Sequence, residues 1–215
     1  MNNPRSDQDI LAGLLSAVSH GRQGEETAAR LLRHFGSLKH VFNGGRSALM
    51  KCGLSEPQAA LLTAMHPVAR RCALEPLGPQ PDLRDGETLR DYVRALYVGV
   101  CNERFMVIGL DKKWQMTGVR TVAEGTMREI PLQPRALIDY VVRSGAAAVI
   151  FAHNHPGGHA EFSRSDIQST QIFANYLRST GVGLVDHLLC AEGQVVSMRE
   201  TSRLPGVFCP ITERD

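Results

Sequence analysis

The sequence lacks the features of membrane proteins, exported proteins and strongly basic nucleic-acid-binding proteins. No apolar run approaches the roughly 18 residues that a membrane-spanning helix needs, so we expect no membrane insertion. The opening residues, MNNPRSD, contain no apolar signal core, so we expect no export. The formal net charge is only +2 at pH 7, which does not by itself indicate nucleic-acid binding.

The sequence also lacks a disulfide framework. Its five cysteines are odd in number and far apart, and no two of them form a C-x-x-C pair. This pattern is typical of a reduced protein with free thiols, so we expect a cytoplasmic location. The length of 215 residues and the hydrophobic content of 43% predict a globular chain of one or two domains.

Residues 1–75 show the apolar spacing of several short helices. Within them, Leu49 to Ser55 joins a short helix to a longer one through an apolar-Gly-apolar turn. This arrangement is similar to helix-hairpin-helix modules, whose turn amides contact a nucleic-acid backbone. It makes Gly53 and Ser55 candidate DNA-binding residues. A small helical packing module explains the same pattern, because residues 1–75 hold nine Lys and Arg against six Asp and Glu.

Four Pro and Gly residues within 76–82 predict a semi-rigid linker between two domains. The region from 83 to 204 mixes helical and strand patterns, which predicts an α+β domain, and 205–215 is predicted to be a loose tail. Helices are predicted over 83–97, 135–143 and 163–178, and strands over 104–110, 115–124, 146–152, 182–191 and 194–198.

The most informative stretch follows the predicted strand 146–152. His153 and His155 are two residues apart on extended backbone, so both imidazoles leave the same face and can bind one metal ion. After a turn at Pro156-Gly157-Gly158, Ser163 begins a helix and Asp166 lies one turn inside it. Two nitrogen donors, one carboxylate and an open position for water are what a catalytic zinc requires.

Ser163 and Asp166 also fit a capping box, in which each satisfies a backbone amide of the other at the start of a helix. The Ser163 hydroxyl can either cap the helix or face the site. A carboxylate bound to zinc is expected to turn away from the N-cap amide. We therefore expect Asp166 to be a metal ligand rather than a capping residue.

His153, His155, Ser163 and Asp166 match H-x-H-x7-S-x2-D, the pattern of the JAB/MPN (JAMM) metalloprotease superfamily. The local motif His-Asn-His-Pro-x-Gly resembles that of its RadC branch. The resemblance to RadC proteins covers about residues 83–204. That branch usually has Ser in place of Gly157 and Asp-Pro-x-Pro in place of 159–162. The resemblance implies a three-layer, cytidine-deaminase-like α+β fold, with a mixed and mostly antiparallel sheet between helices.

The resemblance also implies further site residues. Glu103, just before the strand 104–110, matches the glutamate that acts as general base, although Glu124 and Glu129 are competitors by sequence alone. Ser163 would donate a hydrogen bond to the oxyanion. Asp186-His187 resembles a short RadC motif, and we expect it to support the site rather than bind the metal. Asp186 could accept the second ring N–H of a metal-binding histidine.

Taken together, the residues and the resemblance predict a Zn²⁺-dependent hydrolase, a metallopeptidase or isopeptidase that acts on a peptide or protein substrate. An alternative is a DNA-repair-associated accessory protein without turnover. A metal-dependent nuclease is a further alternative, because His153-Asn154-His155 spells HNH. That nuclease motif, however, spreads its three letters over some thirty residues, whereas here they are contiguous.

Overall fold

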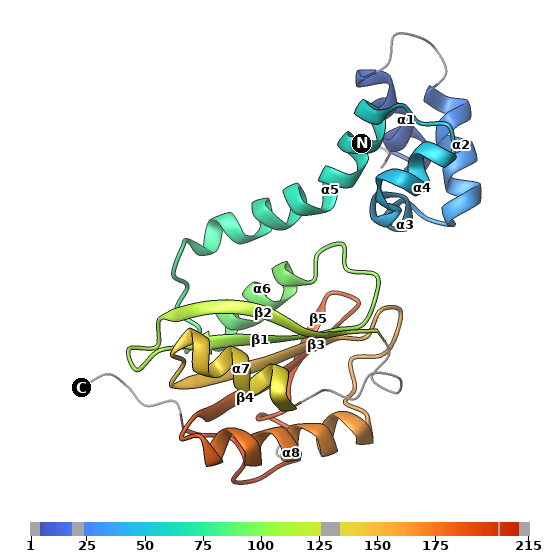
Figure 1. The fold of residues 1–215 in the computed structure, drawn as a ribbon. Helices are drawn as coiled ribbons and strands as arrows, with labels where there is room; N and C mark the ends of the chain where they lie inside the picture. The colour runs from blue at the N-terminus through green and yellow to red at the C-terminus, as the bar shows by residue number, and fades with distance from the viewer. Residues whose placement is uncertain (1–4, 19–23, 126–133, 202, 211–215) are drawn as a thin grey trace. The chain divides into compact units, whose positions relative to one another are not determined.

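A computed structural model of the chain (Figure 1) describes residues 5–18, 24–125, 134–201 and 203–210. The chain divides into two compact units, Met1–Ala73 and Leu74–Asp215, each with a hydrophobic core of its own. Within the described ranges, every helix is too short or too polar to span a lipid bilayer.

The first unit consists of helices packed around leucines. These helices are α1 (Asp7–Ala17), α2 (Gly24–Phe35), α3 (Leu38–Asn43), α4 (Gly45–Lys51) and all but the end of α5 (Glu56–Leu74). Ser6 and Ser37 accept first-turn amides of α1 and α3, which fixes where these helices begin. The fully buried leucines of the core are Leu11, Leu15, Leu31, Leu49 and Leu62.

The second unit is built on a five-stranded sheet in the order β2-β1-β3-β4-β5. Only β3 and β4 pair in parallel, and the other neighbours are antiparallel, so the predicted mixed and mostly antiparallel sheet is confirmed. The strands are β1 (Arg104–Leu110), β2 (Met116–Glu124), β3 (Ala148–Asn154), β4 (Gly183–Ala191) and β5 (Gln194–Ser197).

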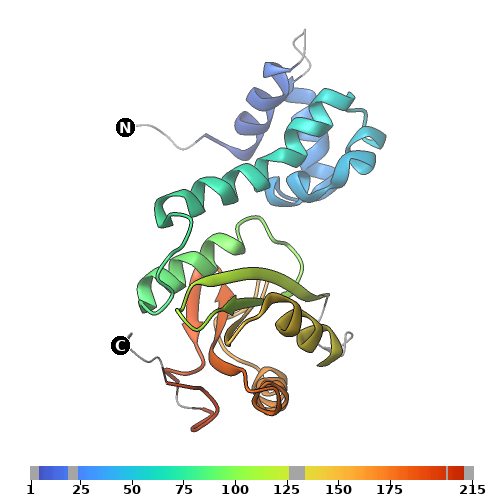
Figure 2. The ribbon, with the colours of Figure 1, turned by 60° about the vertical axis from the view of Figure 1, so that its left-hand side comes forward.

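Helices cover both faces of this sheet, which explains why β1, β3 and β4 are almost continuously apolar. The core around α6 (Gly86–Leu96) lies on one face, and the core around α7 (Pro134–Ser144) and α8 (Arg164–Ser179) lies on the other. Figures 1 and 2 show α6 and α8 on opposite sides of the sheet. The predicted three-layer α+β architecture is thus confirmed.

Two segments are more ordered than the sequence predicts. Leu77, in the predicted linker, is part of the short helix η1 (Glu75–Leu77) and packs against the core around α6. In the predicted tail, Val207 is buried with the α7 and α8 core, and the Cys209 N–H donates to the Leu184 carbonyl at 2.7 Å. The expectation of a loose tail is therefore wrong for this part, because its apolar side chains find a place to bury. Residues 211–215 lie outside the described ranges.

Candidate metal centre

The two histidines lie where β3 ends, on the face of the sheet that α7 and α8 cover. His153 pairs with Phe105 of β1, and His155 continues the extended chain by donating its backbone N–H to the Cys190 carbonyl at 3.0 Å. Both rings therefore leave the same face of the sheet. Their Nε2 atoms lie 3.1 Å apart, which is the convergence that the H-x-H spacing predicts.

Asp166 faces both rings from the first turn of α8. Its Oδ1 lies 3.5 Å from Nε2 of His153, and its Oδ2 lies 3.6 Å from Nε2 of His155. Oδ2 also accepts the backbone N–H and the hydroxyl of Ser163, both at 2.7 Å, so the capping box is complete. The expectation that Asp166 is not a capping residue is therefore wrong: it caps α8 and also faces both histidines, because a carboxylate has two oxygens and several lone pairs.

These three side chains fit a zinc ion in kind and in spacing. Their ligand atoms all lie within 4.8 Å of one another. Atoms bound at 2.0–2.1 Å to one tetrahedral ion would be about 3.3 Å apart. The contacts of 3.1, 3.5 and 3.6 Å between His153, His155 and Asp166 are close to that value. Two imidazoles and a carboxylate also leave a fourth position free for water or substrate.

The charges of the site are coupled. Burial alone would raise the pKa of Asp166, but its contacts with the imidazoles of His153 and His155 outweigh burial and hold that pKa far below its ordinary value. The hydrogen bond to Asp166 raises the pKa of His155, against the opposite effect of burial. The negative carboxylate of Asp166 thus favours a positive charge at this site, either a proton on His155 or a bound cation.

Glu103 directly precedes β1, next to this cluster. Because Phe105 lies opposite His153 in the antiparallel register, Glu103 lies two residues further along the same face, towards His155. After the effects of Asp166 and of burial, the negative charge of Glu103 also raises the pKa of His155. Of its two competitors, Glu124 is bound to the Arg104 guanidinium at 2.7 Å, and Glu129 lies outside the described residues.

Asn154, which the sequence analysis did not single out, holds the backbone on both sides of Glu103. Its Oδ1 accepts the Arg104 N–H at 2.8 Å, and its Nδ2 donates to the Asn102 carbonyl at 3.1 Å. The side chain is buried, with 4% of its surface exposed. The middle residue of His-Asn-His therefore positions the segment that carries the candidate base. A polar residue between the two candidate ligands, directly after an apolar strand, was the available signal in the sequence.

The structure places His187, and not Asp186, on the second nitrogen of a candidate ligand. Neighbours on a strand point to opposite faces, and His187 lies on the α8 face, where its Nε2 is 2.8 Å from Nδ1 of His153. Asp186 instead accepts the Ser197 hydroxyl and the backbone N–H groups of His187 and Arg199. The predicted contact between Asp186 and a metal-binding histidine is therefore wrong.

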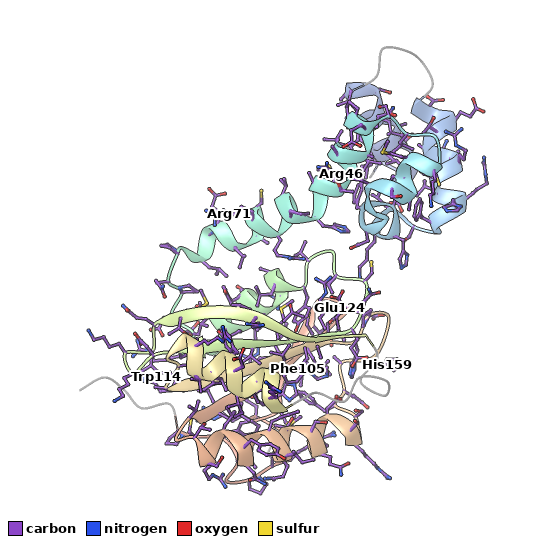
Figure 3. The ribbon with its side chains drawn as sticks, viewed as in Figure 1. Arg46, Arg71, Phe105, Trp114, Glu124 and His159 are labelled. Carbon is purple, nitrogen blue, oxygen red and sulfur yellow. The ribbon has the colours of Figure 1, made fainter. Side chains whose placement is uncertain are left out.

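The loop between β3 and α8 approaches the site through the His159 carbonyl and the Phe162 ring, whose centroid lies 5.8 Å from that of His153. The side chain of His159 is exposed, whereas its carbonyl lies 3.4 Å from Nδ1 of His155 (Figure 3). Gly157 has a φ of +67°, which a glycine adopts without strain and a serine does not. The departure from the RadC pattern at this position thus suits the local backbone.

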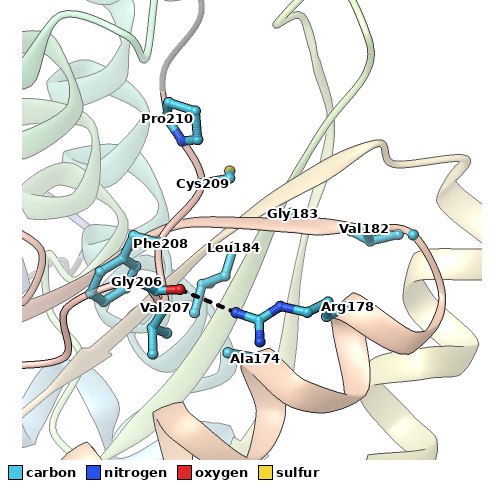
Figure 4. A pocket seen from close by; sticks show the side chains of 11 residues that line it. Ala174, Arg178, Val182, Gly183, Leu184, Gly206, Val207, Phe208, Cys209 and Pro210 are labelled. Atoms are coloured by element: carbon cyan, nitrogen blue, oxygen red, sulfur yellow. Dashed lines mark hydrogen bonds between the residues drawn. The ribbon is translucent and has the colours of Figure 1, made fainter.

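A cavity of about 430 Å³ lies away from the histidines, beside the last turns of α8 (Figure 4). Arg178 lines it and donates to the Gly206 carbonyl at 3.2 Å, and Cys209 and Leu184 lie nearby. Asp166 is at the opposite end of the same helix. None of the candidate catalytic or ligand residues lines this cavity, so we do not assign it to the site.

The candidate DNA-binding residues lie in the other unit, between α4 and α5. Gly53 has a φ of +87° at the turn, as a tight connection between two helices requires. The Ser55 backbone N–H and hydroxyl both donate to Oε1 of Gln58, at 2.9 and 3.1 Å. These two donors already have a partner within the protein, so they are not free to bind a phosphate in this conformation.

The sequence is similar to a known protein family and to bacterial proteins. Residues 83–203 match the family model described as RadC-like JAB domain. A UPF0758 protein of Shewanella amazonensis is 33% identical over 196 residues, which cover 91% of this chain and 87% of that protein. A UPF0758 protein of Nitrosomonas eutropha is 32% identical over 196 residues, 91% of this chain and 88% of that protein.

The match to the family model covers more than half of the chain, and these relatives are similar over nearly all of it. The chain therefore belongs to the RadC-like JAB domain family. Membership supports a hydrolase of the JAB/JAMM type at the level of the family, and the buried cluster of His153, His155 and Asp166 is consistent with a metal site.

Proposed function

We propose that this protein is a zinc-dependent hydrolase that cleaves an amide bond, as a metallopeptidase or an isopeptidase. The observation that carries the proposal is the set of His153, His155 and Asp166, which brings two imidazole nitrogens and a carboxylate together within 4.8 Å. Such a set costs free energy to bury unless its members are paired or bind a cation. Glu103 on the same face supplies a group that can move a proton.

His153, His155 and Asp166 would hold the ion. Zinc bound there supplies Lewis-acid chemistry, which lets water lose a proton near neutral pH and polarises a carbonyl oxygen. Glu103 accepts the proton of the attacking water and returns it to the leaving amine, as a general base and then a general acid. Asn154 keeps Glu103 in place through its two backbone hydrogen bonds.

The role of Ser163 follows from its single proton. The hydroxyl donates to Oδ2 of Asp166 and accepts the N–H of the same residue, so in this conformation it orients the carboxylate and caps α8. The oxyanion role that the resemblance implies requires the hydroxyl to rotate away from Asp166. It stays a prediction, which substitution of Ser163 tests.

The experiment is a screen of zinc-loaded protein against linear peptides and lysine-linked isopeptides, with Glu103→Gln beside the wild type. Because general acid–base catalysis contributes about 10²- to 10⁴-fold, Glu103→Gln should lose that much activity and keep its zinc. Glu124→Gln is the matched control and should cleave like the wild type, because Glu124 binds Arg104 instead. A Glu103→Gln protein as active as the wild type would refute the assignment.

The alternatives predict other outcomes of the same preparation. A protein that binds zinc and cleaves nothing in the screen would favour the alternative of a DNA-repair-associated accessory protein that has no catalytic turnover. Metal-dependent nicking of a supercoiled plasmid that is abolished in His153→Ala would favour a nuclease.

A further inference from the structure

A chain of buried hydrogen bonds runs from the candidate metal site into the protein and back to α8. Nδ1 of His153 lies 2.8 Å from Nε2 of His187. Nδ1 of His187 lies 2.6 Å from Oγ1 of Thr170, and that hydroxyl lies 2.6 Å from the backbone carbonyl of Asp166. His153, His187 and Thr170 each expose 1% or less of their surface, so no solvent competes for these bonds.

Thr170 sets which atom donates in each hydrogen bond of this series. A carbonyl oxygen can only accept, so the contact of 2.6 Å with Asp166 uses the one proton of the Thr170 hydroxyl. This is the bond that a helical threonine commonly makes to the carbonyl four residues earlier. Thr170 must then accept from His187, which places a proton on Nδ1 of His187.

His187 in turn determines which ring nitrogen of His153 carries the proton. Its ring is fully buried, and the rings of Phe105, Phe151 and Phe162 surround it. Such surroundings disfavour a charged imidazole, so a ring with a proton on Nδ1 has a lone pair on Nε2. That lone pair accepts from Nδ1 of His153, so a neutral His153 ring has its proton on Nδ1 and a lone pair on Nε2, which faces His155 and Asp166.

We infer that Thr170 and His187 are positioning residues, which hold the proton of His153 on Nδ1 and keep its Nε2 available to a metal ion. This inference rests on the proposed metal site. Histidines that bind metal usually donate their other N–H to a carboxylate, a carbonyl or water. Here the acceptor is a second imidazole, whose own orientation is fixed by the helix that carries Asp166. The carboxylate ligand and the tautomer of His153 thus depend on the same turn of α8.

The first test needs no metal. Nitrogen-15 NMR of histidine-labelled, metal-free protein distinguishes the two neutral tautomers of each ring. We expect both His153 and His187 with the proton on Nδ1, although free neutral histidine favours Nε2. Thr170→Val keeps the shape of the side chain but cannot accept a hydrogen bond, so His187 should lose its preference for Nδ1–H. Thr170→Ser keeps the hydroxyl and should retain the wild-type pattern.

The second test measures zinc affinity by competition with a chelator. Loss of a group that orients a metal ligand costs about 10- to 100-fold in affinity, so we expect that loss in Thr170→Val and not in Thr170→Ser. A wild-type protein with the proton on Nε2 of His153 or His187 would overturn the inference. So would Thr170→Val with unchanged tautomers and unchanged affinity.

The two tests also separate this inference from the proposed function. The expected tautomers together with weak zinc binding by the wild type would count against the metal site alone. Normal zinc binding with the other tautomers would count against the roles of Thr170 and His187 alone.

Discussion

Among the described residues, the buried side chains of the 1–73 unit are all apolar, whereas the 74–215 unit also buries seven polar ones. Leaving a buried polar group without a hydrogen bond costs about 1–3 kcal/mol, so such groups persist where a network satisfies them. Here they lie in a few connected networks, which include the candidate metal site. The seven residues are His153, Asn154, Asp166, Thr170, Asp186, His187 and Ser197.

The contrast shows which interactions hold the interior of each unit. The interior of the first unit is satisfied by apolar packing and tolerates exchanges of similar volume. The polar interior of the second unit depends on the identity of single atoms, because one lost donor leaves its partner unsatisfied. We therefore expect mutations in the two interiors to differ in kind, with stability affected in one and metal binding in the other.

The largest expected effect on stability is in the first unit. Leu31 is fully buried, and Leu31→Ala should destabilise its unit by about 2–5 kcal/mol through the cavity that it leaves. Urea unfolding of the full chain measures this change, and the exposed Met50→Ala is the control. Zinc affinity should stay at the wild-type value, since Leu31 contacts none of the networks. A parallel loss of zinc affinity would break the contrast between the units.

The second prediction concerns pH. The pKa of His155 is raised above its ordinary 6.5, first by the hydrogen bond to Asp166, so its proton stays bound to a higher pH and competes with zinc. Below the raised pKa, zinc affinity should fall about tenfold per pH unit for one displaced proton, or about 1.4 kcal/mol. Chelator competition between about pH 5.5 and 8.5 measures it. A zinc affinity that is independent of pH across this range would contradict the competition between zinc and the proton of His155.

Ser163 has a smaller expected effect, because its hydroxyl caps α8. Ser163→Ala should cost about 0.5–2 kcal/mol of stability, whereas Ser163→Asn keeps a good N-cap and should cost little. Denaturant unfolding of both variants measures the cap. If Ser163 only positions Asp166 and the helix, Ser163→Asn should also restore hydrolysis. Restored stability without restored hydrolysis would show that the Ser163 hydroxyl does more than cap the helix.

The smallest expected effect is at the turn between α4 and α5. If this turn contacts DNA, the full chain should bind duplex DNA more weakly as salt rises, and Gly53→Glu should weaken the binding further. The Ser55 donors are already bonded to Gln58, so any such binding is expected to be weak. Fluorescence anisotropy at several salt concentrations measures it. Undetectable or salt-independent binding would remove the DNA hypothesis.

The order of elements and the candidate ligands could be predicted from the sequence because both depend on local patterns. Apolar periodicity gave the strands and helices, and the spacing of His153, His155 and Asp166 follows from one strand, one turn and one helix start. The docking of Val207 could not be predicted in this way, because it depends on a partner surface formed by distant residues.

The supporting residues of the site also depend on contacts between distant parts of the chain. His187 is 34 residues from His153 and meets it only because β4 pairs with β3. Which of Asp186 and His187 faces α8 depends on the register, which shifts between Val149 and Ile150. That Asp166 caps α8 and also faces His153 could be seen only from the positions of its two oxygens, which no pattern of residue types contains.

The most direct test of the metal site is elemental analysis of purified protein. We predict close to one zinc per chain in the wild type and in His159→Ala, whose exposed ring is not part of the ligand set. Zinc should be lost in both His155→Ala and Asp166→Ala. Zinc retained in both of these variants, or absent from the wild type after supplementation, would contradict the account.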